Sequence, residues 1–219
     1  MRKVPLVTDN IYHIFNRGVN KQNIFSSESD YDYFLRSATH YLIKSSKFSY
    51  EKFKSSKPSG PNDPGSLGLN DKPKVKIIAY VLMPNHFHFL MKQIADTGIT
   101  SYMQQLSNSY SHYFNTKHER VGPLFQSRFK NVLIETDEQF THLSRYIHLN
   151  PLVSGLTNKL SEYPWSSYLA YLQKTESEIV DPAPILEYFT PPETYEAFVS
   201  DQADYARELE KLKHLTFDN

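Results

Sequence analysis

The sequence predicts an α+β protein with a ferredoxin-like fold, in which a mainly antiparallel sheet with the element order βαββαβα carries helices on one face. Three observations predict it: short runs in which apolar residues alternate, longer segments in which they recur at helical spacing, and two β-prone runs separated by only two turn residues. A C-terminal helical extension is expected after this domain. The fold hosts many functions, so it decides none by itself.

The first elements lie before a polar loop. Residues 10–18 alternate and end in glycine, which predicts a strand with Ile11, His13 and Phe15 on one face. Residues 26–46 begin with Ser, Glu and Asp and then place apolar residues at helical spacing, which predicts a helix. Residues 54–73 hold four Pro, three Gly and four Ser, so we expect a mobile surface loop.

The second half of the domain starts with a hairpin. Residues 74–83 and 86–92 are β-prone and flank Pro84 and Asn85, which predicts two antiparallel strands. A helix over 97–118, capped by Thr97 or Thr100, and a strand within 122–135 follow.

The last helix of the domain is predicted over residues 137–150. Thr136 and Gln139 stand in capping-box relation at its start, and Pro151 is expected to end it. We therefore place the domain at residues 1–151 and the extension at 152–219, where 181–213 reads as one or two acidic amphipathic helices.

Charge is distributed unevenly along the 219 residues. Residues 1–174 carry a net charge of +8 and residues 175–219 carry −8, although the whole chain sums to zero. A basic body raises the expectation of a nucleic-acid partner, while an acidic tail competes with that partner or keeps the protein soluble. The chain has no cysteine, so disulfides, thiolate metal sites and cysteine nucleophiles are excluded. No long apolar segment or secretory signal is present, so we expect a cytoplasmic protein without membrane contact.

Two histidines stand two residues apart in the predicted hairpin. His86 and His88 leave the same face of their strand, with Cα atoms about 7 Å apart, so their imidazoles can converge on one ion. The competing interpretation is that both pack beneath a helix. The strand alone does not choose, and more ligands are needed.

The helix over 137–150 offers candidate partners. Tyr146 and Asn150 are four residues apart and so share one side of the helix, next to the apolar stripe of Phe140, Leu143 and Ile147. Taken alone, such a tyrosine is a packing residue with a wet hydroxyl, and an asparagine before proline is a helix terminator. If these two side chains act with His86 and His88, the four must meet across the sheet surface.

Basic and aromatic residues are interleaved between residues 110 and 130. Basic groups can hold a phosphate backbone while aromatic faces stack on unpaired bases; the competing interpretation is a solvated rim around buried aromatics. Arg17, after the first strand, is a further candidate of this kind. The candidate DNA contacts are Arg17, Lys117, Arg120, Arg128 and Lys130, with His118 in the same run.

Five motifs in order resemble one family. "YHIFNRG", "PNHFHFLM", "GPLFQSRFK", "RYIHLNP" and "YPWSSY" are similar to the REP-associated tyrosine transposases and their insertion-sequence relatives, the single-tyrosine transposases of the His-hydrophobic-His (HUH) superfamily. The similarity covers about residues 8–172.

The resemblance implies a metal-dependent single-strand endonuclease and strand transferase that uses Mg²⁺ or Mn²⁺ and acts on single-stranded or hairpin DNA. It implies Tyr146 as the nucleophile and His86 and His88 as metal ligands. The insertion-sequence relatives have a glutamine four residues after the nucleophile; Asn150 stands there, as in the REP-associated branch, and is the third implied ligand. The longer REP-associated type can act as a monomer, so we favour a monomer over a dimer.

The residue types fit this chemistry. A tyrosine oxygen attacking phosphorus would leave a 5′-phosphotyrosine and a free 3′-hydroxyl, a link that a second 3′-hydroxyl can reverse. Because a phenol has a pKa near 10, its deprotonation needs help, for which His148, His142 and a metal-bound water are candidates. The alternative function is a domesticated protein that binds DNA hairpins without transposition. A ferredoxin-like RNA-binding domain would instead expose aromatics on its central strands.

Overall fold

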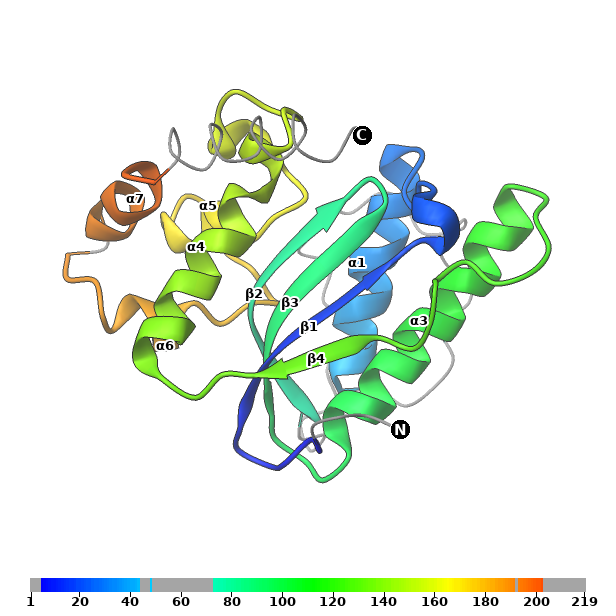
Figure 1. Ribbon diagram of the computed structural model, residues 1–219, viewed down its shortest axis with the longest axis horizontal. Coiled ribbons are helices and arrows are strands. Elements are labelled where there is room, and N and C mark those ends of the chain that lie inside the picture. The colour runs from blue at the N-terminus through cyan, green and yellow to red at the C-terminus, as the bar shows by residue number, and fades with distance from the viewer. Residues whose placement is uncertain (1–4, 44–47, 49–72, 192, 203–219) are drawn as a thin grey trace, which may run out of the picture.

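A computed structural model describes residues 5–43, 48, 73–191 and 193–202. Its centre is a four-stranded antiparallel sheet in the order β2-β3-β1-β4 (Figure 1). The strands are β1 (Ile11–Arg17), β2 (Val75–Met83), β3 (His86–Gln93) and β4 (Lys130–Leu133). The main helices are α1 (Glu28–Ile43), α3 (Gly98–Lys117) and α4 (Asp137–Val153). The short elements are η1 (Val19–Lys21), η2 (Leu160–Glu162), α5 (Tyr168–Tyr171), α6 (Ala183–Leu186) and α7 (Glu193–Ser200).

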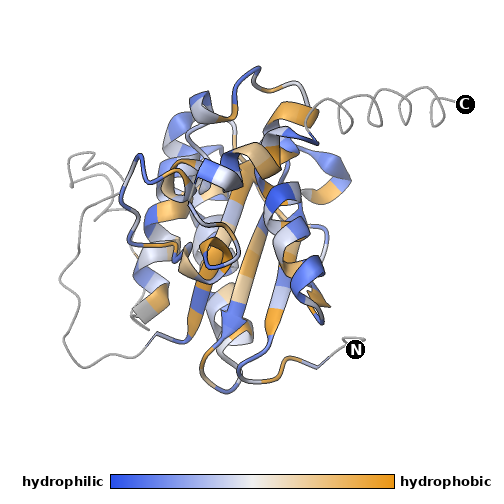
Figure 2. Cartoon of the chain, turned by 90° about the vertical axis from the view of Figure 1, so that its left-hand side faces the viewer, coloured by the Kyte–Doolittle hydropathy of each residue, from blue (hydrophilic) through white to orange (hydrophobic). Residues whose placement is uncertain are grey.

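The ferredoxin-like α+β fold predicted from the sequence is confirmed, but the expectation that the helices share one face of the sheet is wrong for α4, which packs on β2 and β3 from the other side. Helices α1 and α3 cross between strands and cover one face of the sheet, while α4 lies against the other face (Figure 1). Alternation along β3 separates these faces, since Phe87 and Phe89 pack on Phe34 of α1 and the alternating His86 and His88 point the other way. Apolar residues accordingly concentrate along the central strands (Figure 2).

The C-terminal extension covers the sheet edge formed by β2. The backbone of Trp165 accepts a hydrogen bond from Leu82 N–H at 2.9 Å, and the N–H of Ser167 donates to the Tyr80 carbonyl at 3.0 Å. An edge strand with unpaired backbone groups would invite association with other strands, and this segment removes that edge. Helix α7 then packs on α4 and places Tyr195 and Val199 in the core.

Two local expectations about α4 have different outcomes. Thr136 caps its start, since its Oγ1 accepts the Gln139 N–H at 3.1 Å. The expected end at Pro151 is wrong, because α4 continues to Val153. Proline removes a single backbone N–H, and Ser154 N–H still donates to the Asn150 carbonyl at 3.0 Å, so one more turn survives.

Other expected segments differ in extent or fall outside the described residues. The strand expected within 122–135 is reduced to β4, preceded by an irregular segment with one isolated bridge between Gly18 and Phe125. The loop expected at 54–73, apart from residue 73, and the acidic helix beyond residue 202 lie outside what the structure describes. Within the described residues, no helix combines the length and apolar character needed to cross a membrane.

Candidate active site

The two histidines of β3 lie on the sheet face that α4 covers. His86 is half-buried and His88 is 7% exposed, and their ring centroids are 5.0 Å apart with perpendicular planes. The two-residue period of the strand puts both side chains on one face, as the sequence predicts. Their role as ligands stays a prediction.

A third histidine, His13 of β1, joins them. Its Nε2 lies 2.8 Å from Nδ1 of His88, and the two rings stack with centroids 5.0 Å apart. Strand pairing explains the contact, because β1 is antiparallel to β3 with Phe15 opposite His88, which puts His13 two residues along the same face. Sequence reasoning placed His13 on a face with Ile11 and Phe15 but could not tell that this face meets His88.

Helix α4 brings Tyr146 and Asn150 to the same surface. The Tyr146 ring meets His88 edge-on at a centroid distance of 5.6 Å and His13 at 6.3 Å. Despite these contacts, Tyr146 is 51% exposed. Asn150 Nδ2 donates to the Tyr146 carbonyl at 2.8 Å, and its side chain also hydrogen-bonds His86. The structure thus unites the four side chains that the sequence proposed as partners.

Burial keeps the histidines neutral. It lowers the pKa of His86 to about 4, with the positive charge of Arg17 acting in the same direction and the Asn150 hydrogen bond opposing it. Burial also lowers the pKa of His13 to about 4, and it holds the pKa of His88 well below its usual value, helped by the neighbouring His13, His86 and Arg17. Neutral imidazole is the form that binds metals.

The hydrogen bonds of the rings decide which nitrogens remain available. His86 Nδ1 lies 2.6 Å from Asn85 Oδ1, an oxygen that can only accept, so the proton sits on Nδ1 and the lone pair on Nε2. Ligating histidines normally donate their other N–H to such a carbonyl group. The His13–His88 bond likewise occupies Nδ1 of His88 and leaves its Nε2.

The donor set fits a divalent cation of borderline softness. Nε2 of His86, Nε2 of His88 and Oδ1 of Asn150 would supply three neutral donors, a set that would suit Mn²⁺ better than Mg²⁺ because Mg²⁺ prefers oxygen. No group of three or more His, Cys, Asp or Glu side chains able to hold a metal occurs in the described part of the chain. Any ion at this site therefore depends on an amide ligand and on oxygens from outside the protein.

Two of the expected DNA contacts flank the histidines. Arg17 is exposed and pairs in register with His86 across β1 and β3. Lys130 is exposed on β4 and its Nζ lies 6.0 Å from the centroid of Phe15, which stacks on His13. Their role as phosphate contacts stays a prediction.

Two other expected DNA contacts, Lys117 and Arg120, bond to polar groups of the protein itself. Lys117 Nζ lies 2.7 Å from a carboxylate oxygen of the buried Asp30 and bonds to two serine hydroxyls at the start of α1. His118 also contacts this carboxylate, at 3.2 Å. Arg120 donates to Gln22 at 3.0 Å and to Asn115 at 3.2 Å. Because local polar groups engage these cations, they tie α3 and its following loop to the body.

The histidines proposed to assist Tyr146 lie elsewhere. His148 is two residues, hence about 200°, around α4 from Tyr146, and its two nitrogens bond Tyr195 Oη at 2.7 Å and Ser167 Oγ at 2.8 Å. It is completely buried, and burial lowers its pKa to about 3, so it is a structural residue. His142 packs on Phe198 and faces Arg145 at 3.2 Å, toward the extension.

Comparisons with known proteins agree with the motif resemblance. Residues 68–150 match the family described as "Transposase IS200 like". This span includes His86, His88, Tyr146 and Asn150 but not His13. The REP-associated tyrosine transposase of Escherichia coli (strain K12) is 25% identical over 99 residues, which cover 45% of this chain and 56% of the relative. The chain thus spans little more than half of that curated protein.

A solved structure shares the fold. It is described as the REP-associated tyrosine transposase bound to a REP hairpin, and it superposes with a TM-score of 0.54 at 15% identity over 83% of this chain and 96% of the other. The sequence matches and this common fold together confirm the resemblance to the IS200-like and REP-associated transposases.

Proposed function

We propose that the chain is a divalent-metal-dependent single-strand DNA endonuclease and strand transferase, with Tyr146 as its nucleophile. One observation carries the proposal: the half-exposed Tyr146 stands edge-on to the neutral His88 and His13, and Asn150 of the same helix bonds His86, the next histidine on that face of β3. A packing role explains buried histidines, but it does not explain why the tyrosine beside them faces solvent. Single-stranded or hairpin DNA is the substrate, by analogy with the relative whose structure is described as bound to a REP hairpin.

Each side chain of the site has its own role in the proposed reaction. Nε2 of His86, Nε2 of His88 and Oδ1 of Asn150 would hold the cation, which when bound offsets negative charge on the scissile phosphate. Arg17 and Lys130 position the backbone on either side. Tyr146 Oη forms a bond to phosphorus as the bond to the 3′ oxygen breaks; the phenolic proton passes to solvent and the departing oxygen takes one up. The product is a 5′-phosphotyrosine and a 3′-hydroxyl, and attack by a 3′-hydroxyl reverses the step.

A monomer is sufficient for this arrangement. Tyr146 reaches the histidines of its own chain, and the extension holds α4 in place through the bond from Tyr195 to His148. We therefore expect covalent activity to scale linearly with protein concentration, with a monomeric mass in light scattering.

The experiment incubates the protein with Mn²⁺ and end-labelled hairpin DNA and resolves covalent adducts on a denaturing gel. Wild type should form an adduct, and Tyr146→Phe should not. Tyr188→Phe is the matched control, since Tyr188 is 48% exposed but lies outside the site. An adduct that persists in Tyr146→Phe overturns the nucleophile assignment. DNA binding without any adduct in wild type favours the hairpin-binding protein instead.

A further inference from the structure

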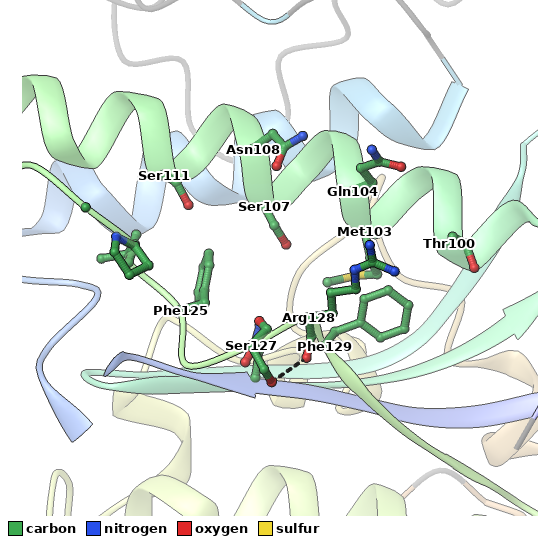
Figure 3. Close-up of a pocket in the computed structure, with 14 residues that line it drawn as sticks. Thr100, Met103, Gln104, Ser107, Asn108, Ser111, Phe125, Ser127, Arg128 and Phe129 are labelled. Carbon is green, nitrogen blue, oxygen red and sulfur yellow. Dashed lines mark hydrogen bonds between the residues drawn. The ribbon is translucent and has the colours of Figure 1, made fainter. Parts of the chain in front are cut away.

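A cavity of about 390 Å³ lies between α3 and the segment 122–129, on the sheet face opposite the histidines. Figure 3 shows Ser107 and Ser111 pointing from α3 toward this segment, and Arg128 pointing back toward the helix. Its volume falls in the range of small-ligand sites. The proposed active site uses none of the residues that line it.

The walls of the cavity offer unused hydrogen-bonding groups. The side chains of Gln104, Ser107, Asn108 and Ser111 lie along one helical face, and none of them bonds to any residue that the structure describes. Amide side chains such as Gln104 and Asn108 can both donate to and accept from the edge of a base.

The other lining residues give the cavity an apolar surface and a positive charge. Phe125 is half-buried and Phe129 is 8% exposed, so these two rings give the cavity an apolar surface for a flat ring, above the buried Met103 and Leu124. Arg128 is exposed and supplies a cation, and no lining residue is acidic. An apolar floor, an amide-bearing wall, a cation and no carboxylate together suit a nucleotide.

The cavity is joined to the active-site strand through Asn16. Asn16 Nδ2 donates to the Ser127 carbonyl at 3.0 Å, which fixes the cavity wall to β1, and the residues on either side of Asn16 face the histidine surface. Strand β4 is the sheet edge between the two faces, and Lys130 stands on it. A DNA strand crossing the histidines can therefore turn around this edge and reach the cavity.

We propose that this cavity binds one unpaired nucleotide of the single-stranded DNA, reading its base with Gln104 and Asn108 and holding its phosphate with Arg128. The inference rests on the proposed function for the identity of the ligand. It adds a second contact with the strand, away from the scissile phosphate, that can select a base.

The absence of cysteine makes a site-specific test possible. Ser107→Cys introduces the only thiol in the chain, and a single-stranded oligonucleotide carrying a disulfide on one base would exchange with it. Thr116→Cys, exposed on α3 outside the cavity, is the control. We expect cross-linking at least about tenfold faster at position 107, because binding raises the local concentration of the disulfide. Unmodified single strand should suppress it, and dAMP at equal concentration should not.

Other results overturn the proposal. Equal rates at both positions show nonspecific reaction, and equal suppression by dAMP assigns the cavity to free nucleotides. Asn108→Ala should weaken oligonucleotide binding about tenfold in fluorescence anisotropy, and an unchanged affinity contradicts base reading. Cross-linking needs neither metal nor Tyr146, so it stands apart from the proposed chemistry. A Tyr146 adduct without selective cross-linking overturns only the proposal that the cavity binds a nucleotide. Selective cross-linking without a Tyr146 adduct overturns only the proposed cleavage chemistry.

Discussion

Nε2 of His13 lies 2.8 Å from Nδ1 of His88, so the two strands at the centre of the sheet share a hydrogen bond between histidines. A bond between two neutral imidazoles needs one donor and one acceptor. If His88 is to offer the lone pair of its Nε2, its Nδ1 carries the proton and His13 accepts it. His13 then orients a ligand without being one.

His13→Ala should weaken Mn²⁺ binding by about 10- to 100-fold, because second partners of ligating histidines typically contribute this much. His13→Gln keeps an acceptor oxygen and should lose less. Isothermal titration of the protein without DNA measures both. His112→Ala, an exposed histidine on α3, is the control. Wild-type affinity in His13→Ala would exclude the orienting role.

Arg17→Gln and Lys130→Gln should each weaken single-stranded DNA binding and reduce the slope of log affinity against log salt by about 0.7, because each removes one phosphate contact. Lys117→Gln should leave both quantities unchanged, since Asp30 already pairs this lysine inside the protein. Anisotropy titrations at several salt concentrations compare the three variants. Equal effects in all three would mean that general positive charge, and not position, governs binding.

Tyr195→Phe should destabilise the fold by about 1–3 kcal/mol, because it removes the hydroxyl that bonds both His148 and Ser144 inside the core. The adduct yield per folded molecule should stay close to that of wild type, because His148 faces away from Tyr146. Urea unfolding and the Mn²⁺ adduct assay measure the two effects. If Tyr195→Phe folds stably but forms no adduct, His148 takes part in the reaction.

Asp30 should make stability depend on pH in the acid range. Burial raises the pKa of its carboxyl, but hydrogen bonds from Lys117, the Ser26 N–H and His118, with the charge of Lys117, outweigh this and leave the pKa below its usual value. Since the folded pKa lies below the unfolded one, the contribution is complete above the unfolded value, about 3.9, and is lost as pH falls through the folded value.

Asp30→Asn tests this with a control on the same helix. At pH 7 it should cost about 3 kcal/mol, because Lys117 loses its buried partner, and the difference from wild type should shrink below pH 4. Asp32→Asn, whose partner Arg36 is 3.9 Å away, should cost much less. A difference for Asp30→Asn that is the same at pH 3 and pH 7 would contradict the assignment.

Local pattern was enough to predict the sheet, the hairpin and the helices that carry the site. The two-residue period of β3 places His86 and His88 together, and the spacing of α4 places Tyr146 beside Asn150. The end of α4 was missed because proline in a last turn costs only one hydrogen bond, and surrounding packing decides whether the turn persists.

The sequence by itself determined which side chains share a face within one element, because strand and helix periods are properties of the local backbone. Only the tertiary structure decided which faces meet. Pairing of β1 with β3 brought His13 to His88, burial of Asp30 turned Lys117 into a structural cation, and docking of α7 enclosed His148. These contacts join residues 47 to 87 positions apart, and the chain's local preferences carry no information on such distances until the core has assembled.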